Sequence, residues 1–159
     1  PSLMISFNYR HMIPQEVLEL MPGRVINLHT SYLPYNRGSS PNFFSFLENT
    51  PKGVTIHLMS AGLDEGDILC QRELHFDEEK ETFASTYEAL LQEIEKLFRE
   101  NWQQIREGSV IPVKQAGPVT YHRMKDLDAI REKVDFDWNM KIGDFKRAYE
   151  KAMRKDENS

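Results

Sequence analysis

The sequence has one cysteine, no long apolar run and no excess of positive charge. A single thiol, Cys70, cannot form a disulfide within the chain. A membrane-spanning helix needs about 20 consecutive apolar residues, which no segment supplies. The net charge of −5 disfavours nucleic acid as a partner, because binding to nucleic acid depends on clustered Lys and Arg. We therefore predict a cytoplasmic protein that acts away from membranes.

Several motifs that would indicate other chemistries are also missing. The His, Cys and Asp residues do not show the spacing of metal ligands, so we predict no metal site. The Gly-x-Ser-x-Gly turn of serine hydrolases does not occur, nor does a glycine-rich phosphate-binding loop. The protein is therefore expected to work with small-molecule substrates through ordinary polar side chains.

What is present is the composition and patterning of a globular α/β domain. The chain has 159 residues, 40% of them hydrophobic and 28% charged, which is enough for a single packed core. Apolar and β-branched runs predict strands, and apolar residues spaced by threes and fours predict helices. The first strand, helix and strand together predict a parallel βαβ unit. The predicted strands cover residues 3–7, 24–29, 53–59 and 67–74, and the predicted helices cover residues 14–21, 42–47, 82–107, 125–131 and 143–154.

Polar side chains are concentrated where two of these strands end. Asn27 and His29 lie two positions apart on the second strand, so their side chains point to the same face of the sheet. Asp64 lies in the glycine-containing loop after the third strand, and ligands of open α/β sheets bind at such strand ends. An amide and an imidazole can stabilise an oxyanion, and a carboxylate can orient the imidazole, favour its protonated form and accept a proton. These three residue types suit acyl transfer to an amine.

The same residues also have structural interpretations. An Asn-x-His sequence at a strand end is common in turns and caps, and an Asp near a glycine is common in loops. His57, in the middle of the third strand, can be a hydrogen-bonded structural histidine. Spacing alone leaves these alternatives open.

Several motifs in this region resemble those of the folate-dependent formyltransferases, which act on glycinamide ribonucleotide, methionyl-tRNA or nucleotide-linked amino sugars. They occur in the same order over roughly a hundred residues, which makes the resemblance specific. The motifs are Asn-Leu-His-Thr-Ser-Tyr-Leu-Pro at 27–34, Arg37-Gly38, Gly-Val-Thr-Ile-His at 53–57 and Leu-Asp-Glu-Gly-Asp-Ile at 63–68. The resemblance implies a mostly parallel, Rossmann-like sheet flanked by helices.

The resemblance also implies site residues and a donor. The catalytic Asn, His and Asp of the family fall on Asn27, His29 and Asp64, and the formyl donor would be 10-formyltetrahydrofolate, bound without a metal. The pterin pocket and its surroundings would involve the side chains of Tyr9, Arg10, Met12 and His57 and the backbone of Ala61, Gly62 and Leu63. Alternatives remain for two of these residues, since Met12 can be a core residue and Arg10 a solvated surface charge.

The acceptor implied by the resemblance is an amine of a nucleotide-linked sugar. The sequences at 33–38 and 121–126 look most like those of the sugar formyltransferases, while a methionyl-tRNA or glycinamide ribonucleotide acceptor is the alternative. A noncatalytic folate-binding homologue that keeps the fold but has lost turnover is a further alternative.

The resemblance predicts how the chain is organised. Residues 1–113 would form the catalytic core, and residues 114–159 would form an extension that packs on or beside it. The chain starts at what resembles the fourth strand of the family, so we expect a core truncated in its N-terminal half. The strand at residues 3–7 would then have an open apolar edge, which favours pairing with other protein and a homo-oligomer.

Overall fold

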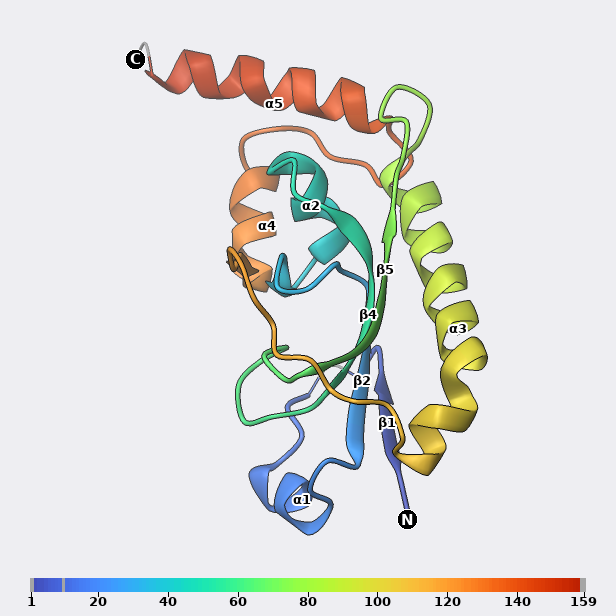
Figure 1. Ribbon diagram of the computed structural model, residues 1–159. Helices are drawn as coiled ribbons and strands as arrows, with labels where there is room; N and C mark the ends of the chain where they lie inside the picture. Colours follow the sequence, from blue (N-terminus) through green and yellow to red (C-terminus); the bar gives the residue numbers. More distant parts are fainter. Residues whose placement is uncertain (1, 10, 158–159) are drawn as a thin grey trace.

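The four long strands of the protein form one sheet. The computed structural model describes residues 2–9 and 11–157. Arg10, predicted to contact the pterin, lies outside the described residues. The elements are β1 (Met4–Phe7), α1 (Gln15–Leu20), β2 (Val25–His29), β3 (Arg37–Gly38), α2 (Pro41–Leu47), β4 (Lys52–Leu58), β5 (Ile68–Leu74), α3 (Phe83–Glu107), β6 (Tyr121–His122), α4 (Met124–Arg131) and α5 (Ile142–Glu157). The predicted α/β class, with a central sheet flanked by helices, is confirmed (Figure 1).

The strands lie in the order β1-β2-β4-β5. β1 and β2 are parallel, as predicted for the βαβ unit, with Met4 beside Val25 and Phe7 beside Leu28. The expectation of a mostly parallel sheet needs correction for the other pairs, because β4 runs antiparallel to both β2 and β5. Only residues 59–67 connect β4 to β5, which is shorter than the crossover that a parallel connection needs.

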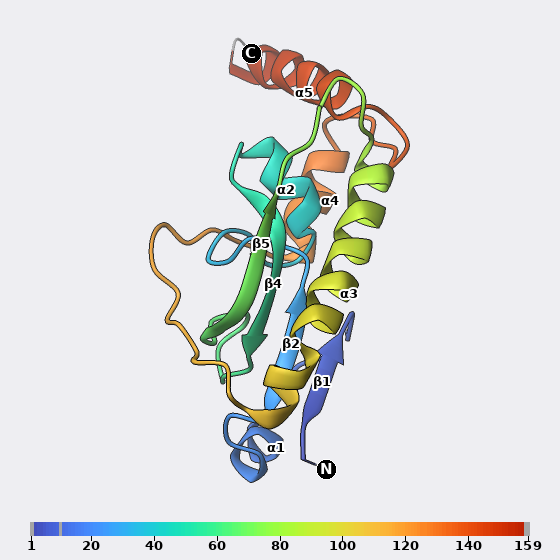
Figure 2. The same cartoon turned by 45° about the vertical axis from the view of Figure 1, so that its right-hand side comes forward.

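Alternation along the strands separates a core face from a polar face. On β2, Ile26 and Leu28 are buried in a cluster with Leu90 and Ile94 of α3. Val54 and Ile56 of β4 belong to the same cluster. Successive strand side chains point to opposite faces, so the residues between these apolar positions face away from α3. α3 covers one face of the sheet, and the loop between β4 and β5 lies on the other (Figures 1 and 2).

The ends of α3 follow from local sequence. Thr82 and Ser85 form a reciprocal capping box, in which each side chain accepts a hydrogen bond from the backbone N–H of the other residue. Gly108 follows the helix in the left-handed conformation, with φ 70°, as its sequence position predicts. Leu90, Ile94, Leu97 and Ile105 of this helix are buried and complete the main core.

A second core joins the C-terminal segment to the rest of the chain. Phe43 and Phe83 pack against Phe145 of α5 and Phe136, with ring centroids 5.2–5.5 Å apart. Leu127 of α4 is buried in the same cluster. The C-terminal helices therefore rest on α2 and the start of α3, while α5 continues along the upper edge of the molecule (Figure 1).

A two-stranded parallel sheet of β3 and β6 was not predicted. It pairs Arg37 with Tyr121 and Gly38 with His122. Next to it, the His122 ring stacks on Phe44, with centroids 3.6 Å apart, and Nε2 lies 2.7 Å from Glu48 Oε1. This small sheet attaches the extension to the segment that follows β2.

β1 is an edge strand within the described part of the chain, and its side chains support the predicted open edge. Ile5 is 42% exposed and Phe7 is 37% exposed. We expect the 159-residue chain to self-associate as its concentration rises, because unpaired strand edges template pairing. Ile5→Lys should reduce the association measured by light scattering, and a parent chain that stays monomeric at all concentrations would contradict this prediction.

None of the described helices is both long and apolar enough to span a membrane. The described residues also contain no group of three or more His, Cys, Asp and Glu side chains suited to hold a metal ion. Burial raises the pKa of the Cys70 thiol to about 11, so this side chain packs as a thiol rather than a reactive thiolate.

Candidate active site

The structure brings Asn27, His29 and Asp64 together on the polar face of the sheet. Asn27 Nδ2 donates to Asp64 Oδ1 at 3.3 Å, and His29 Nε2 lies 3.8 Å from Asp64 Oδ2. His29 and Asp64 are each 8% exposed, so little solvent screens their interaction. The strand alternation that buries Ile26 and Leu28 against α3 therefore turns the two polar residues of β2 toward the Asp64 loop.

His57 completes this cluster from the neighbouring strand. Antiparallel pairing places it opposite Asn27, and its side chain is almost fully buried. Its Nδ1 donates to the backbone oxygen of Leu58 at 2.8 Å, so the other nitrogen of a neutral ring is an acceptor. That Nε2 lies 3.3 Å from Asn27 Nδ2 and 3.5 Å from Asp64 Oδ1. Asn27 therefore directs its amide hydrogens toward His57 and Asp64.

The backbone around Asp64 is unusual for a non-glycine residue. Asp64 has φ 52°, in the left-handed region, which Asp adopts more readily than most residues. Gly66 follows it where the chain passes very close to β4, and a Cβ atom built there would lie 1.6 Å from Leu58 O. Only glycine fits at that position. The loop is thereby pressed against β4, which brings Asp64 beside His57.

A second close approach delivers a backbone donor to the carboxylate. Gly38 N–H donates to Asp64 Oδ2 at 3.0 Å. Gly38 has φ 87°, and a Cβ atom on it would lie 2.3 Å from the backbone oxygen of His122 in β6. Glycine is needed here for both the conformation and the contact with β6, so the β3–β6 sheet positions a hydrogen-bond partner of Asp64.

These neighbours keep Asp64 ionised. Burial opposes ionisation, but the His29 and His57 rings and the Gly38 N–H together hold the pKa of the carboxyl below its ordinary value of 3.8. Both carboxylate oxygens accept hydrogen bonds, Oδ1 from Asn27 and Oδ2 from Gly38. Asp64 is therefore a fixed negative charge at neutral pH, able to act as a proton acceptor.

The protonation of His29 differs from the expectation drawn from sequence. Burial lowers its pKa below the ordinary value of 6.5, and although Asp64 acts in the opposite direction, the net effect favours the neutral ring. Its Nε2 faces two oxygen atoms, Asp64 Oδ2 and, at 3.2 Å, Asn36 O. A neutral ring therefore carries its proton on Nε2. The expected imidazolium is not the favoured form because desolvation outweighs the attraction of one carboxylate.

This shift predicts how the stability of the chain depends on pH. The pKa of His29 is lower in the folded than in the unfolded state. The neutral His29 ring therefore contributes its full stabilisation above pH 6.5, and this contribution is lost as the pH falls. The free energy of unfolding, measured in urea, should fall between about pH 7.5 and about pH 5, and it should fall less in His29→Gln than in the parent. His75→Gln is the control, because the side chain of His75 is exposed, and its stability should change with pH as that of the parent does. An equal loss in His29→Gln and the parent would contradict the prediction.

The residues expected around the pterin differ in how exposed they are. Tyr9 is 57% exposed and Met12 is 59% exposed, so core packing does not account for Met12. They follow β1, whose carboxyl end lies beside that of β2, at the edge of the sheet where Asn27 and His29 occur. Ala61 and Leu63 are exposed and Gly62 is half-buried, on the same loop as Asp64. Their part in binding stays a prediction.

Sequence reasoning missed several residues that hold the cluster. Asn36 is fully buried, with φ 56°, and presents its carbonyl to His29 while Thr50 Oγ1 donates to its side-chain oxygen at 2.8 Å. Gln115 donates to backbone oxygens of the Asp64 loop. No sequence motif pointed to Gln115, because the carbonyls that it binds lie 51 and 49 positions away along the chain.

Comparison with known proteins places the chain in a family. The sequence profile described as "Formyl transferase" matches residues 1–101. The chain belongs to the formyl transferase family. This confirms the resemblance seen in the motifs around Asn27 and Asp64, since the matched range includes both.

The curated relatives of the chain include proteins named for two different acceptors. The chain is 32% identical over 129 residues to a dTDP-4-amino-4,6-dideoxyglucose formyltransferase of Mycobacterium bovis, covering 81% of this chain and 54% of that protein. It is 33% identical over 141 residues to a methionyl-tRNA formyltransferase of Bacillus mycoides, covering 87% of this chain and 43% of that protein. The chain thus spans about half the length of these curated relatives.

Solved structures of the family show the same fold. The formyltransferase PseJ from Anoxybacillus kamchatkensis, in complex with UDP-4,6-dideoxy-4-formamido-L-AltNAc and tetrahydrofolate, matches with a TM-score of 0.84 and 43% identity, over 89% of this chain and 75% of that one. An N-formyltransferase from Helicobacter canadensis, in complex with folinic acid and dTDP-3-aminofucose, matches with a TM-score of 0.73 and 26% identity, over 83% of this chain and 48% of that one.

Proposed function

We propose that the protein transfers a formyl group from 10-formyltetrahydrofolate to an amine of a nucleotide-linked amino sugar. The observation that carries this proposal is the buried cluster of Asn27, His29 and ionised Asp64 in a chain whose relatives are named formyltransferases. The cluster offers the hydrogen-bond donors and the proton acceptor that acyl transfer to nitrogen requires.

The reaction forms a carbon–nitrogen bond to the acceptor amine and breaks the bond between the formyl carbon and N10 of the folate. The amine loses a proton and N10 gains one, so the transfer is redox-neutral and needs no oxidant. Asn27 would donate to the developing oxyanion, and the Nε2–H of His29 would donate to it by exchanging its 3.2 Å contact with Asn36 O. Asp64 would take the proton from the attacking nitrogen, because its carboxylate is held ionised beside these donors.

Asn27 enters this mechanism with both of its amide hydrogens directed at protein partners. In this structure they face Asp64 Oδ1 and His57 Nε2. For Asn27 to donate to an oxyanion, one of these 3.3 Å contacts must be shared or exchanged. Both are long for N–H donors, so exchanging one forfeits little. His57 would then hold the remaining hydrogen and keep the amide oriented.

The folate donor is supported by the relatives and by the position of the Asp64 loop. PseJ is described in complex with tetrahydrofolate, and the Helicobacter canadensis protein with folinic acid. In this chain, the backbone at residues 61–63 leads into Asp64, and Tyr9 and Met12 offer exposed apolar surface at the same edge of the sheet. We propose that the pterin binds between these two segments.

The acceptor is proposed from the sugar-acting relatives. Both solved structures cited above are described in complex with nucleotide-linked sugars. Methionyl-tRNA is the alternative, because methionyl-tRNA formyltransferases match the chain with similar identity. Against it, the net charge of −5 offers little attraction for RNA. We further propose that residues 1–113 form the catalytic core and residues 114–159 an extension packed on it.

The proposed function is tested by binding and turnover in the full-length protein. Calorimetry with a folate analogue should show binding, and tetrahydrofolate should be released when 10-formyltetrahydrofolate is mixed with a UDP- or dTDP-linked 4-amino sugar. Glycinamide ribonucleotide and methionyl-tRNA are the competing acceptors. Release only with methionyl-tRNA would replace the acceptor proposal. Folate binding without release for any amine would instead indicate a noncatalytic homologue.

A further inference from the structure

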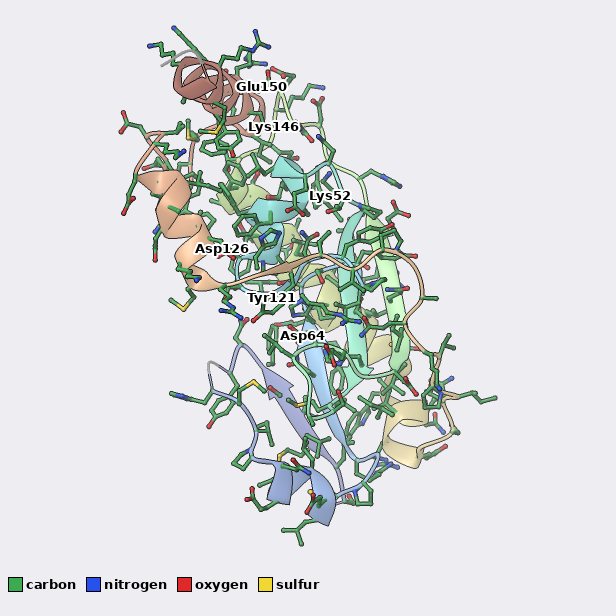
Figure 3. All side chains as sticks on the ribbon, turned by 90° about the vertical axis from the view of Figure 1, so that its left-hand side faces the viewer. Lys52, Asp64, Tyr121, Asp126, Lys146 and Glu150 are labelled. Atoms are coloured by element: carbon green, nitrogen blue, oxygen red, sulfur yellow. The ribbon has the colours of Figure 1, made fainter. Side chains whose placement is uncertain are left out.

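Gln115 is less exposed than the rest of the loop that contains it. From Ile111 to Val119, in the connection between α3 and β6, it is the one side chain that is not exposed. This connection crosses the face of the sheet that carries Asp64 and leads to Tyr121 (Figure 3). A polar side chain that alone turns inward from an exposed segment indicates a specific set of partners.

Both ends of the Gln115 amide are occupied. Nε2 donates to Asp64 O at 2.7 Å and to Gly66 O at 2.8 Å. Oε1 accepts from Arg37 Nη2 at 2.8 Å and from Arg37 Nε at 3.2 Å. Reversing the amide would place an oxygen against two carbonyls and an NH₂ group against a guanidinium. The orientation of Gln115 is therefore fixed by its partners.

Two of the three partners of Gln115, Asp64 and Arg37, lie at or next to the two ends of one hydrogen bond in the site. Asp64 Oδ2 accepts from Gly38 N–H, and Gly38 follows Arg37 directly in the chain. Gln115 thus holds the backbone of Asp64 on one side and the side chain of Arg37 on the other. Arg37 adds a weaker contact to the same loop, from Nη1 to Glu65 Oε1 at 3.4 Å.

The Asp64 loop needs such support because of its backbone conformation. The left-handed φ of 52° at Asp64 is less stable than a right-handed or extended conformation, even though Asp tolerates it better than most residues. Strained residues persist at functional sites only when surrounding contacts over-determine them. The two carbonyls bound by Gln115, at Asp64 and Gly66, bracket the turn that carries the carboxylate toward Gly38 and His29.

We propose that Gln115 is a positioning residue for the catalytic carboxylate: its amide holds the loop at residues 60–66 and Arg37 together so that Asp64 stays on Gly38 N–H and beside His29. The kinetic consequence of this role rests on the proposed formyl transfer, whereas its structural consequence does not. The role also assigns to the extension after residue 113 a direct part in shaping the site.

The substitution Gln115→Glu tests the donor half of the amide. Glutamate has the same length and keeps an oxygen for Arg37, but it turns an oxygen toward the two carbonyls that Nε2 now binds. In the folded variant, the NMR resonance of the Gly38 amide proton should move from its parental position, because its bond to Asp64 loosens. Gln104→Glu, on an exposed part of α3, is the matched control and should leave this resonance in place.

The kinetic readout is a double-mutant cycle with Asp64→Asn in the full-length protein. Gln115→Glu alone should lower kcat about tenfold to a hundredfold, since displacement of a catalytic group by about 1 Å can cost that much. In the Asp64→Asn background the same substitution should lower kcat by less than twofold, because a group that acts through Asp64 loses its effect when the carboxylate is gone. A merely structural role would give equal losses in both backgrounds.

Each outcome decides the proposal. A shifted Gly38 resonance together with non-additive losses supports it, and an unchanged resonance or additive losses overturn it. If the parent transfers no formyl group to any amine, the proposed function fails, and the Gly38 resonance still decides whether Gln115 positions the loop. Should Gln115→Glu not fold, Gln115→Met provides the same two readouts, since it also removes the donor.

Discussion

Asp64→Asn is expected to lower kcat by on the order of a hundredfold or more, while weakening the binding of a folate analogue much less. Asparagine has nearly the same shape and tolerates the left-handed φ of 52° at this position. It can still accept one hydrogen bond from Asn27 or Gly38. What it lacks is the negative charge that Asp64 retains because its pKa is held below 3.8. Proton acceptance from the amine should therefore fail while the site remains assembled.

The measurement combines steady-state kinetics with calorimetry on the same protein preparations. Asp67→Asn is the matched control, since it makes the same chemical change on the half-buried carboxylate three residues further along the chain, and it should stay near parental kcat. If Asp64→Asn turned over like the parent, Asp64 would have no role in proton transfer. A collapse of folate binding in Asp64→Asn would instead assign Asp64 to the donor pocket.

Phe145→Ala is expected to lower the free energy of unfolding of the whole chain by about 3–5 kcal/mol. Phe145 is fully buried, and its ring lies 5.2–5.5 Å from those of Phe43, Phe83 and Phe136. Removing the ring leaves a cavity between α5 and the α2 region that rigid neighbours cannot fill. Because this cluster joins the extension to the core, the loss should appear in one cooperative transition.

Urea denaturation followed by circular dichroism measures this loss. Met124→Ala is the control in the same part of the chain, because Met124 is 75% exposed and its truncation should change stability by less than about 0.5 kcal/mol. A variant of Phe145 in which α5 melts separately, with the main transition unchanged, would contradict the proposal that residues 114–159 pack as part of one cooperative unit.

Much of the fold could be predicted from local pattern alone. The alternation in β2 and the spacing of apolar residues in α3 are strong periodic signals, and both elements were placed within one or two residues of their observed ends. The convergence of Asn27 and His29 followed from the same alternation. Their proximity to Asp64 was suggested by the ligand-binding edge of α/β sheets and is present in the structure.

What could not be predicted depends on contacts between distant segments. β3 and β6 are two-residue strands without periodicity, and their pairing joins residues more than eighty positions apart. The direction of β4 is not encoded in its own apolar pattern, so a parallel neighbour and an antiparallel neighbour look alike in sequence. The neutral state of His29 reflects its burial, and burial of a polar side chain is a property of the assembled structure.

The most direct test of the proposed chemistry is to follow the formyl carbon itself. Full-length protein would be incubated with 10-formyltetrahydrofolate labelled with ¹³C in the formyl group and with a UDP- or dTDP-linked 4-amino sugar, and the carbon would be located by NMR. We expect the label to appear as a formamide on the sugar nitrogen, at a rate that falls by on the order of a hundredfold in Asp64→Asn. Label that remains on the folate, or appears only as free formate, would contradict formyl transfer to the sugar by the cluster of Asn27, His29 and Asp64.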